Sequence, residues 1–262
     1  MFAALAEVAF RTQLTFRVQL WALLFSGLLD IVVRTSIWTA VYGDVPAVNG
    51  ITLPQMITYG ILSGAILTGW DATQIVRDVG AQIKSGAIAS HLLRPMHYPL
   101  ALLAEQVGRR LYDLLLIGLP GGAIVGLVFG LQPPASAGHF LVFVGLVAVS
   151  ILVVFAVGII FALLSFWVLD FHSLEWFMRG LMVVFSGNLV PLWFFPGWLA
   201  AIAGATPFAF VTYYPLAVYL GRFDLSAAAL VLLGGLCWFA VLAGIIAGLW
   251  ALLTRRLILA GG

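Results

Sequence analysis

An acidic and a basic residue lie four positions apart inside a long apolar run near the start of the chain. Asp30 and Arg34 belong to the run 18–42, and their spacing places both side chains on one face of a helix. Ionisable groups inside an apolar helix cost free energy and are often functional, which makes the pair a candidate for substrate contact or for gating a pathway. The alternative is a self-neutralising ion pair packed against neighbouring helices.

Residues that usually build catalytic or metal sites are few and scattered. The four histidines show no metal-ligand spacing: His91, His97, His139 and His172. Cys237 is the only cysteine, which excludes an intrachain disulfide. The only lysine, Lys84, follows Ile83, so the sequence has no glycine-rich phosphate loop ending in Gly-Lys. We therefore expect no catalytic residue, no metal site and no bound cofactor in this chain.

The composition indicates the environment that surrounds these residues. Of 262 residues, 63% are hydrophobic and only 8% are charged, and the mean hydropathy is +1.15. A soluble domain carries about 25% charged residues because its surface must be hydrated. The sequence therefore excludes a soluble globule and a disordered chain, and it predicts an all-α integral membrane protein. The net charge of +2 is spread too thinly to predict a nucleic-acid partner.

Six apolar segments are predicted to cross the bilayer, since about 20 residues span its core as a helix. Five of them follow directly from the pattern: 18–42, 54–76, 111–131, 140–169 and 225–254. A further charge-free segment contains four prolines: Pro191, Pro196, Pro207 and Pro215. We interpret this segment as one span followed by an outer, re-entrant helical hairpin over 191–222.

The basic residues set the orientation, because cytoplasmic loops are enriched in Lys and Arg. With six spans, every Lys and Arg except Arg34 and Arg222 falls on the side of the two termini. We therefore expect a single multi-pass domain over 1–262 with both termini in the cytoplasm.

The segment 1–17 is predicted to form an interfacial helix ahead of the first span. At the helical period Phe2 and Ala9 share one face, whereas Glu7 and Arg11 lie opposite. Such a helix lies along the cytoplasmic leaflet. The alternative is a frayed beginning of the first span.

Glycines recur at every fourth position of the third span: Gly118, Gly122, Gly126 and Gly130. Because glycine has no side chain, this stripe predicts the close approach of another helix, in the same chain or in a second one. Pro120 predicts a kink beside the stripe.

The longest cytoplasmic loop, 78–97, mixes apolar and charged residues, and its helical pattern ends at a proline. A short amphipathic helix here is either a docking element for a soluble partner or a segment that lies on the lipid. The candidate docking residues are Ile83, Lys84, Gly86, Ile88, Leu92, Leu93, Arg94 and Pro95.

This loop resembles the coupling-helix region of type-2 ABC exporter permeases, in which an apolar residue and a glycine precede Leu and Pro. The matching positions are Ile83, Gly86, Leu92, Leu93, Arg94 and Pro95. The tract 191–222 is similar to the external hairpin of a small bacterial branch of that group. It matches at Pro191, Pro196, Pro207, Phe208, Pro215 and Gly221. The resemblance covers essentially the whole chain.

The resemblance implies a permease subunit that works with other chains in the bacterial cytoplasmic membrane. Two copies of a separate ABC ATPase, which bind ATP and magnesium, would dock on the cytoplasmic side. A second permease, identical or related, would complete the assembly. The helix around 83–93 would transmit closure of the ATPase to the first and second spans.

The resemblance also implies export. A wide apolar pathway between two permeases, lined mainly by the first, second and fifth spans, suits a hydrophobic or amphipathic cargo such as a drug, an organic cation or a lipid-like molecule. The aromatic outer hairpin would form the exit gate, or would only anchor the fifth span. Besides Asp30 and Arg34, the gate residues would be Pro191, Pro196, Pro207, Phe208, Tyr213, Tyr214 and Pro215.

Two other classes of function are alternatives. An ion-coupled secondary transporter usually has internal repeats and midplane charges, but the two halves of this sequence show no repeat, and Asp30 with Arg34 is the only deep charged pair. A membrane-embedded enzyme or assembly factor would show a catalytic constellation at one membrane depth, and none stands out.

Overall fold

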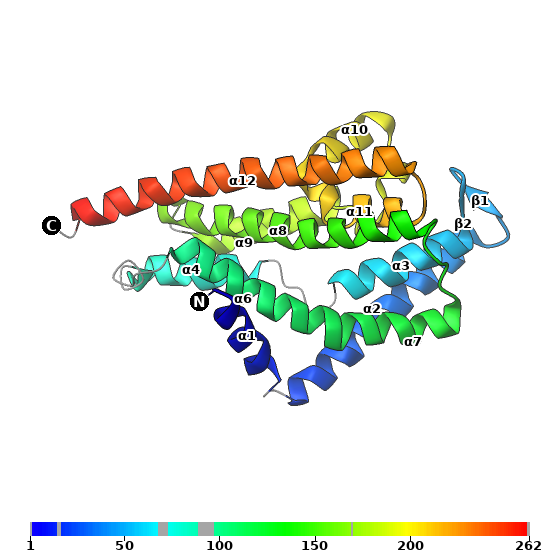
Figure 1. The fold of residues 1–262 in the computed structure, drawn as a ribbon, viewed down its shortest axis with the longest axis horizontal. Coiled ribbons are helices and arrows are strands. Elements are labelled where there is room, and N and C mark those ends of the chain that lie inside the picture. The colour runs from blue at the N-terminus through cyan, green and yellow to red at the C-terminus, as the bar shows by residue number, and fades with distance from the viewer. Residues whose placement is uncertain (1, 15–16, 68–72, 89–96, 169, 261–262) are drawn as a thin grey trace.

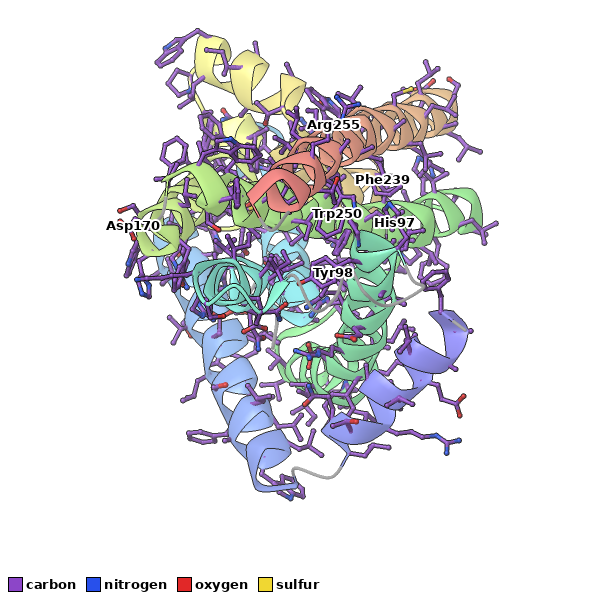
Figure 2. All side chains as sticks on the ribbon, turned by 90° about the vertical axis from the view of Figure 1, so that its left-hand side faces the viewer. His97, Tyr98, Asp170, Phe239, Trp250 and Arg255 are labelled. Carbon is purple, nitrogen blue, oxygen red and sulfur yellow. The ribbon has the colours of Figure 1, made fainter. Side chains whose placement is uncertain are left out.

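Long apolar runs without turn residues build the longest helices of the structure. The computed structural model describes residues 2–14, 17–67, 73–88, 97–168 and 170–260. Most of its helices run along the long axis of the molecule (Figure 1). We call the end that carries His97 and Asp170 the terminal end, because the last helix also ends there (Figures 1 and 2). The opposite end is the hairpin end.

Four helical rods are long and apolar enough to cross a bilayer. They are α2 (Arg17–Tyr42), α8 (Ala137–Val168), α12 (Leu225–Ala260) and a continuous rod from Tyr98 to Phe129. These helices confirm the predicted all-α membrane class. They match the predicted first, fourth and last spans closely, whereas the third begins at Tyr98 rather than at residue 111.

The rod from Tyr98 to Phe129 contains a local widening at the predicted kink. It consists of α6 (Tyr98–Asp113), a π-helical turn η1 (Leu114–Gly118) and α7 (Leu119–Phe129). Pro120 lies just after the π-helical turn. Proline has no N–H to donate and its ring crowds the preceding turn, so the helix widens instead of breaking.

Two of the predicted spans differ from the expectation. The fifth span was expected inside the charge-free, proline-containing segment, but α9 (Phe171–Phe185) begins before that segment and includes Glu175 and Arg179. It has 15 residues, which corresponds to a length of about 22 Å. Within the predicted span 54–76, the structure describes α3 (Leu53–Leu67) and, from Gln74 onward, α4 (Gln74–Lys84). Residues 68–72 between them lie outside the described residues.

Helix α8 is the centre of the bundle. It lies between α12 on one side and α4 on the other, and α9 also packs against it (Figure 1). Its side chains Val153, Ile159 and Leu163 are fully buried, and they share a core with Met178 of α9 and Leu253 of α12. The charge-free sequence of α8 follows from this position, since a helix covered on several sides has no solvated face.

The glycine stripe packs partly within the chain. A Cβ added at Gly118 would lie 2.1 Å from the carbonyl oxygen of Ala65, and one added at Gly122 would lie 3.0 Å from the Ala65 Cβ. These two glycines therefore let α7 and η1 approach α3. Gly126 faces Leu131 just beyond its own helix, and Gly130 ends α7 with a φ of +85°. The first half of the stripe is thus an internal helix contact.

The predicted N-terminal helix is α1 (Phe2–Gln13), and it packs on the protein. A Cβ added at Gly108 of α6 would lie 2.1 Å from the carbonyl oxygen of Ala6, and the ring of Phe10 meets that of Tyr112 edge-on at 5.7 Å. Phe10 therefore faces α6. Glu7 pairs with Arg11 on the exposed side.

Short elements close the hairpin end. Two antiparallel strands, β1 (Ala47–Val48) and β2 (Ile51–Thr52), follow α2. The predicted helical hairpin is built from η2 (Leu192–Phe194), α10 (Gly197–Ala205), η3 (Pro207–Phe210) and α11 (Tyr213–Tyr219). These elements lie beside α8 and α12 (Figure 1).

Candidate pathway cluster and coupling junction

The predicted pair on α2 is closed, and it also binds a second part of the chain. Arg34 Nε donates to Asp30 Oδ2 at 2.7 Å. Arg34 Nη1 donates to both the main-chain oxygen of Asn188, at 2.9 Å, and its side-chain oxygen, at 3.0 Å. Asn188 lies just beyond the end of α9. The arginine therefore joins α2 to the turn after α9, so the closed ion pair is also packed against a neighbouring segment.

The turn that Arg34 holds is fixed from a second side. Tyr59 of α3 donates its hydroxyl to the carbonyl oxygen of Gly187 at 2.7 Å, and Gly187 has a φ of +74°. A Cβ added at Gly187 would lie 2.8 Å from the Tyr213 Cβ, so the position requires glycine. We call Asp30, Arg34, Tyr59, Gly187 and Asn188 the pathway cluster.

The pathway cluster opens on the outer face of α2. The Asp30 side chain is 50% exposed, whereas that of Arg34 is 20% exposed. Around Asp30 the same helix exposes apolar side chains, among them Phe25 and Val33. Helix α12 is as exposed as α2, with the same buried share of its span, but its sequence has no charged residue from 225 to 254. The exposed faces of α2 and α12 therefore differ, because only the α2 face carries a carboxylate.

The predicted gate residues of the hairpin are at least partly buried, except Pro196, which is exposed. Pro191 is buried, Pro196 precedes α10, and Pro207 begins η3. Phe208 stacks on Phe185 of α9 with ring centroids 6.3 Å apart. Pro215 is buried in α11. The hairpin is therefore attached to the end of α9.

Two tyrosines hold the hairpin together. Tyr214 donates its hydroxyl to the carbonyl oxygen of Gly204 at 2.9 Å, which ties α11 to α10. The backbone N–H of Tyr213 donates to the carbonyl oxygen of Ser186 at 3.0 Å. Tyr213 also packs its ring on Trp193 at 5.5 Å. The hairpin and the turn after α9 thus form one packed unit next to the pathway cluster.

The candidate docking residues divide into covered and exposed positions. Ile88 is 1% exposed and Ile83 packs against the core, so this chain itself covers both. Lys84 and Gly86 are exposed, and Gly86 forms the turn after α4 with a φ of +73°. The remaining candidates lie outside the described residues: Leu92, Leu93, Arg94 and Pro95.

A buried carboxylate links α4 to α9, and sequence reasoning did not identify it. Glu175 of α9 pairs with Arg77 of α4 and with Arg179 at 3.4 Å, and it accepts a hydrogen bond from the Thr73 hydroxyl at 3.1 Å. The Glu175 side chain is only 10% exposed. We call these four residues the coupling junction. The available signal was the spacing of four between Glu175 and Arg179 and between Thr73 and Arg77.

The beginning of α9 is fixed by a capping aspartate. Asp170 accepts hydrogen bonds from the backbone N–H groups of His172 and Ser173, and from the Ser173 hydroxyl. The Ser173 hydroxyl bond holds the pKa of the Asp170 carboxyl below its usual range. The cap satisfies donors that the first helical turn leaves free. Helix α9 therefore has a defined beginning at Asp170 and a defined end at the pathway cluster.

The described part of the chain offers no cluster of His, Cys, Asp or Glu side chains that would hold a metal ion. The family model for the ABC-2 family transporter protein matches residues 28–261. The chain belongs to the ABC-2 transporter family. No curated protein and no solved structure matches it.

Membership of this family gives the pathway cluster and the coupling junction a functional context. An ABC-2 permease is a multi-pass membrane subunit of an ABC transporter, and permeases of this family typically work with ABC ATPase partners. The family thus suggests a subunit whose role is passage of the cargo rather than catalysis. For such a subunit, the pathway cluster and the coupling junction are the candidate functional sites.

Proposed function

We propose that this ABC-2 permease exports a hydrophobic or amphipathic molecule, such as a drug, an organic cation or a lipid-like compound. Two copies of a separate ABC ATPase would supply the energy from ATP and magnesium, and a second permease, identical or related, would form the other half of the pathway. The observation that carries the proposal is the half-exposed Asp30 carboxylate on the otherwise apolar outer face of α2.

A carboxylate that faced lipid at this position would be costly, so the α2 face is better suited to a water-containing pathway or a second permease. The charge-free face of α12 suits lipid. Helices α2 and α12 lie on opposite sides of the molecule (Figure 1). The pathway would therefore run between the α2 side of this chain and the facing permease, with Asp30 available to a cationic or amphipathic cargo.

A continuous set of contacts leads from the proposed docking region to this pathway. Helix α4, which ends at the exposed Lys84, is joined to α9 by Glu175. The far end of α9 is joined to α2 by Asn188 and Arg34. Movement of α4 by the ATPase would thus reach α2 through one short, capped helix. Basic residues gathered at the terminal end support a cytoplasmic position for that end.

The proposal is tested by purifying the tagged protein from its own host in mild detergent and assaying the complex. We expect an ABC ATPase to copurify and ATP to drive transport in vesicles. A Lys84→Glu variant should lower ATP-driven transport without lowering membrane insertion, and Arg255→Glu, an exposed charge reversal on α12, is its control. A protein that is repeatedly recovered without any ATPase, even after crosslinking, would favour an ion-driven carrier instead.

A further inference from the structure

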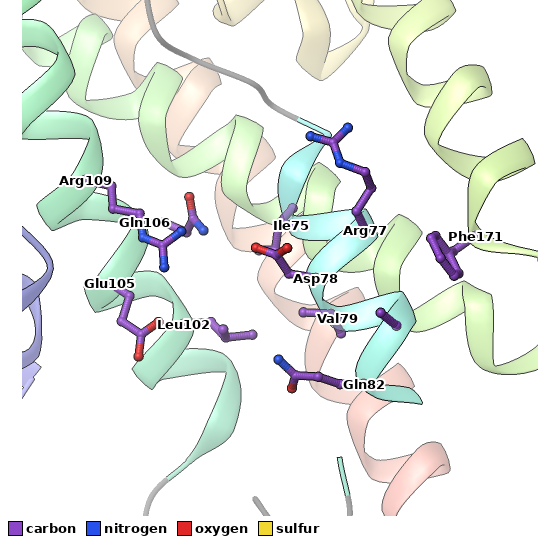
Figure 3. Close-up of a pocket in the computed structure, with 11 residues that line it drawn as sticks. Ile75, Arg77, Asp78, Val79, Gln82, Leu102, Glu105, Gln106, Arg109 and Phe171 are labelled. Carbon is purple, nitrogen blue, oxygen red and sulfur yellow. The ribbon is translucent and has the colours of Figure 1, made fainter. Parts of the chain in front are cut away.

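A cavity of about 520 Å³ opens between α4 and α6 at the terminal end. Figure 3 shows Glu105, Gln106 and Arg109 projecting from α6 toward α4, which presents Asp78 on the facing side. With Arg77, the lining contains two positive and two negative side chains, and apolar residues complete the walls. The volume lies in the range of small-ligand sites.

Two charges of opposite sign in this cavity do not neutralise each other. Glu105 and Arg109 are four residues apart on α6, a spacing that usually closes an ion pair. Among the residues that the structure describes, neither side chain forms a salt bridge or a hydrogen bond, and Asp113, four residues farther on and outside the lining, interacts with Arg109 only through its charge. Both are partly buried. A ligand that carries both signs of charge would satisfy them together.

The position of the two charges along α6 matches the order of groups in a lipid headgroup. From Leu114 onward the rod is charge-free, and Arg109 lies five residues before that point, about 8 Å along the helix. Glu105 lies one turn farther from the apolar run. The polar headgroup layer begins where the hydrocarbon core ends. In a phospholipid the phosphate is the group nearer the acyl chains, and the ammonium is the outer one.

We propose that this cavity binds the headgroup of a zwitterionic phospholipid, with the phosphate on Arg109 and a primary ammonium on Glu105. The lining has no net charge, so it gives no advantage to an anionic headgroup. Phe171 is the only aromatic residue among the described lining residues, whereas quaternary ammonium groups are usually recognised by aromatic cages. The site therefore suits an ethanolamine headgroup better than a choline headgroup.

The test is the thermal unfolding of delipidated, full-length protein in detergent after addition of phosphatidylethanolamine, phosphatidylcholine or phosphatidylglycerol. We expect phosphatidylethanolamine to raise Tm by about 2–4 °C more than the other two lipids, because a ligand of the native state stabilises it. Equal stabilisation by all three lipids would overturn the proposal. Equal stabilisation by soluble phosphoethanolamine would also overturn it, since a free zwitterion would then account for the site.

Variants of Glu105 and Arg109 test which side chain binds the ammonium group and which binds the phosphate. Glu105→Gln should remove the preference for phosphatidylethanolamine over phosphatidylglycerol, and Arg109→Gln should remove stabilisation by both lipids. Arg255→Gln, which removes an exposed charge outside the cavity, should respond as the wild type does. A wild-type response of Glu105→Gln and Arg109→Gln would contradict the assignment. If one variant does not fold, native mass spectrometry of the wild type should still show retained ethanolamine phospholipid, and its absence would reject the proposal.

Discussion

At the scale of single residues, one guanidinium group performs two tasks in the pathway cluster. Its Nε binds Asp30 on the same helix, and its Nη1 binds the two oxygens of Asn188 at the end of α9. These bonds need the planar fork of arginine, because an ammonium group is a compact point charge without this geometry. Charge alone is therefore insufficient at position 34.

We expect Arg34→Lys to lower transport several-fold while the protein still inserts and assembles. The lysine keeps the positive charge near Asp30 but cannot reproduce both sets of hydrogen bonds. The measurement is ATP-driven transport in proteoliposomes, with Arg222→Lys at the hairpin end as the matched control. Full transport by the Arg34→Lys variant would show that the bonds to Asn188 are dispensable.

Glu175 is the second residue with consequences beyond its own helix. We expect Glu175→Gln to lower the free energy of unfolding by about 1.5–3 kcal/mol, because buried hydrogen bonds to a charged group are lost. Glu7→Gln is the control, since the Glu7–Arg11 pair is exposed and such pairs contribute about 0–1 kcal/mol. Chemical denaturation of both variants decides the point: equal losses would refute a special role for the coupling junction.

At the scale of elements, close helix contacts in this chain depend on glycine, which has no side chain. Gly118 lets η1 approach α3, and Gly108 lets α1 approach α6, each at a carbonyl oxygen. Within a bilayer such close approach replaces the hydrophobic effect as the source of helix association. Gly244 of α12 makes no such close contact, because a Cβ added there would meet nothing within 4 Å.

We expect opposite effects from two Gly→Ala substitutions. Gly118→Ala should destabilise the protein by about 1–3 kcal/mol, because the added methyl overlaps the Ala65 carbonyl and forces the helices apart. Gly244→Ala should be neutral or stabilising by up to about 1 kcal/mol, since alanine favours the helix and the space is open. Unfolding midpoints of the two variants in the same detergent measure the difference, and matching midpoints would contradict the packing.

The sequence predicted the long elements well and the short ones poorly. Hydropathy located α2, α8 and α12 because charge-free runs of this length have few alternatives. Its bound for the second span, residue 76, lies nine residues beyond the end of α3 at Leu67, because mean hydropathy tolerates single polar residues such as Thr68 and Asp71. The pair Asp30–Arg34 was visible from spacing, but its third partner, Asn188, lies 154 residues away and is polar without being charged. Glu175 was hidden for the same reason, because its Thr73 and Arg77 partners are set by tertiary packing.

At the scale of the whole molecule, the two sides of the bundle are chemically unequal. The α2 side presents a carboxylate among apolar residues, and the α12 side presents apolar and small residues with Cys237 exposed. A protein with one charged and one uncharged flank would have a preferred side for the second permease that we propose. Because Cys237 is the only cysteine in the sequence, cysteines introduced on either flank can test this arrangement by crosslinking.

We expect Val33→Cys, in a Cys237→Ser background, to crosslink to a second permease in native membranes. Val33 is 52% exposed and lies three residues from Asp30 on α2. Leu230→Cys on α12, at a position that is 67% exposed, should crosslink little. The mass of the product on a gel identifies an identical or a related partner. Strong crosslinking from position 230 and none from position 33 would place the assembly on the other flank.

The shortness of α9 has a consequence for the lipid around it. This helix is about 22 Å long, whereas the hydrocarbon layer of an average bilayer is about 30 Å thick. A bilayer that matches the long helices on the α12 flank must therefore thin next to α9, at an elastic cost of a fraction of a kcal/mol per ångström. We expect transport in vesicles to increase as the acyl chains of the lipids are shortened, and a rate independent of chain length would argue against this deformation. The protein would then deform its membrane most strongly where α9 meets the lipid, because the distance across the membrane is shortest there.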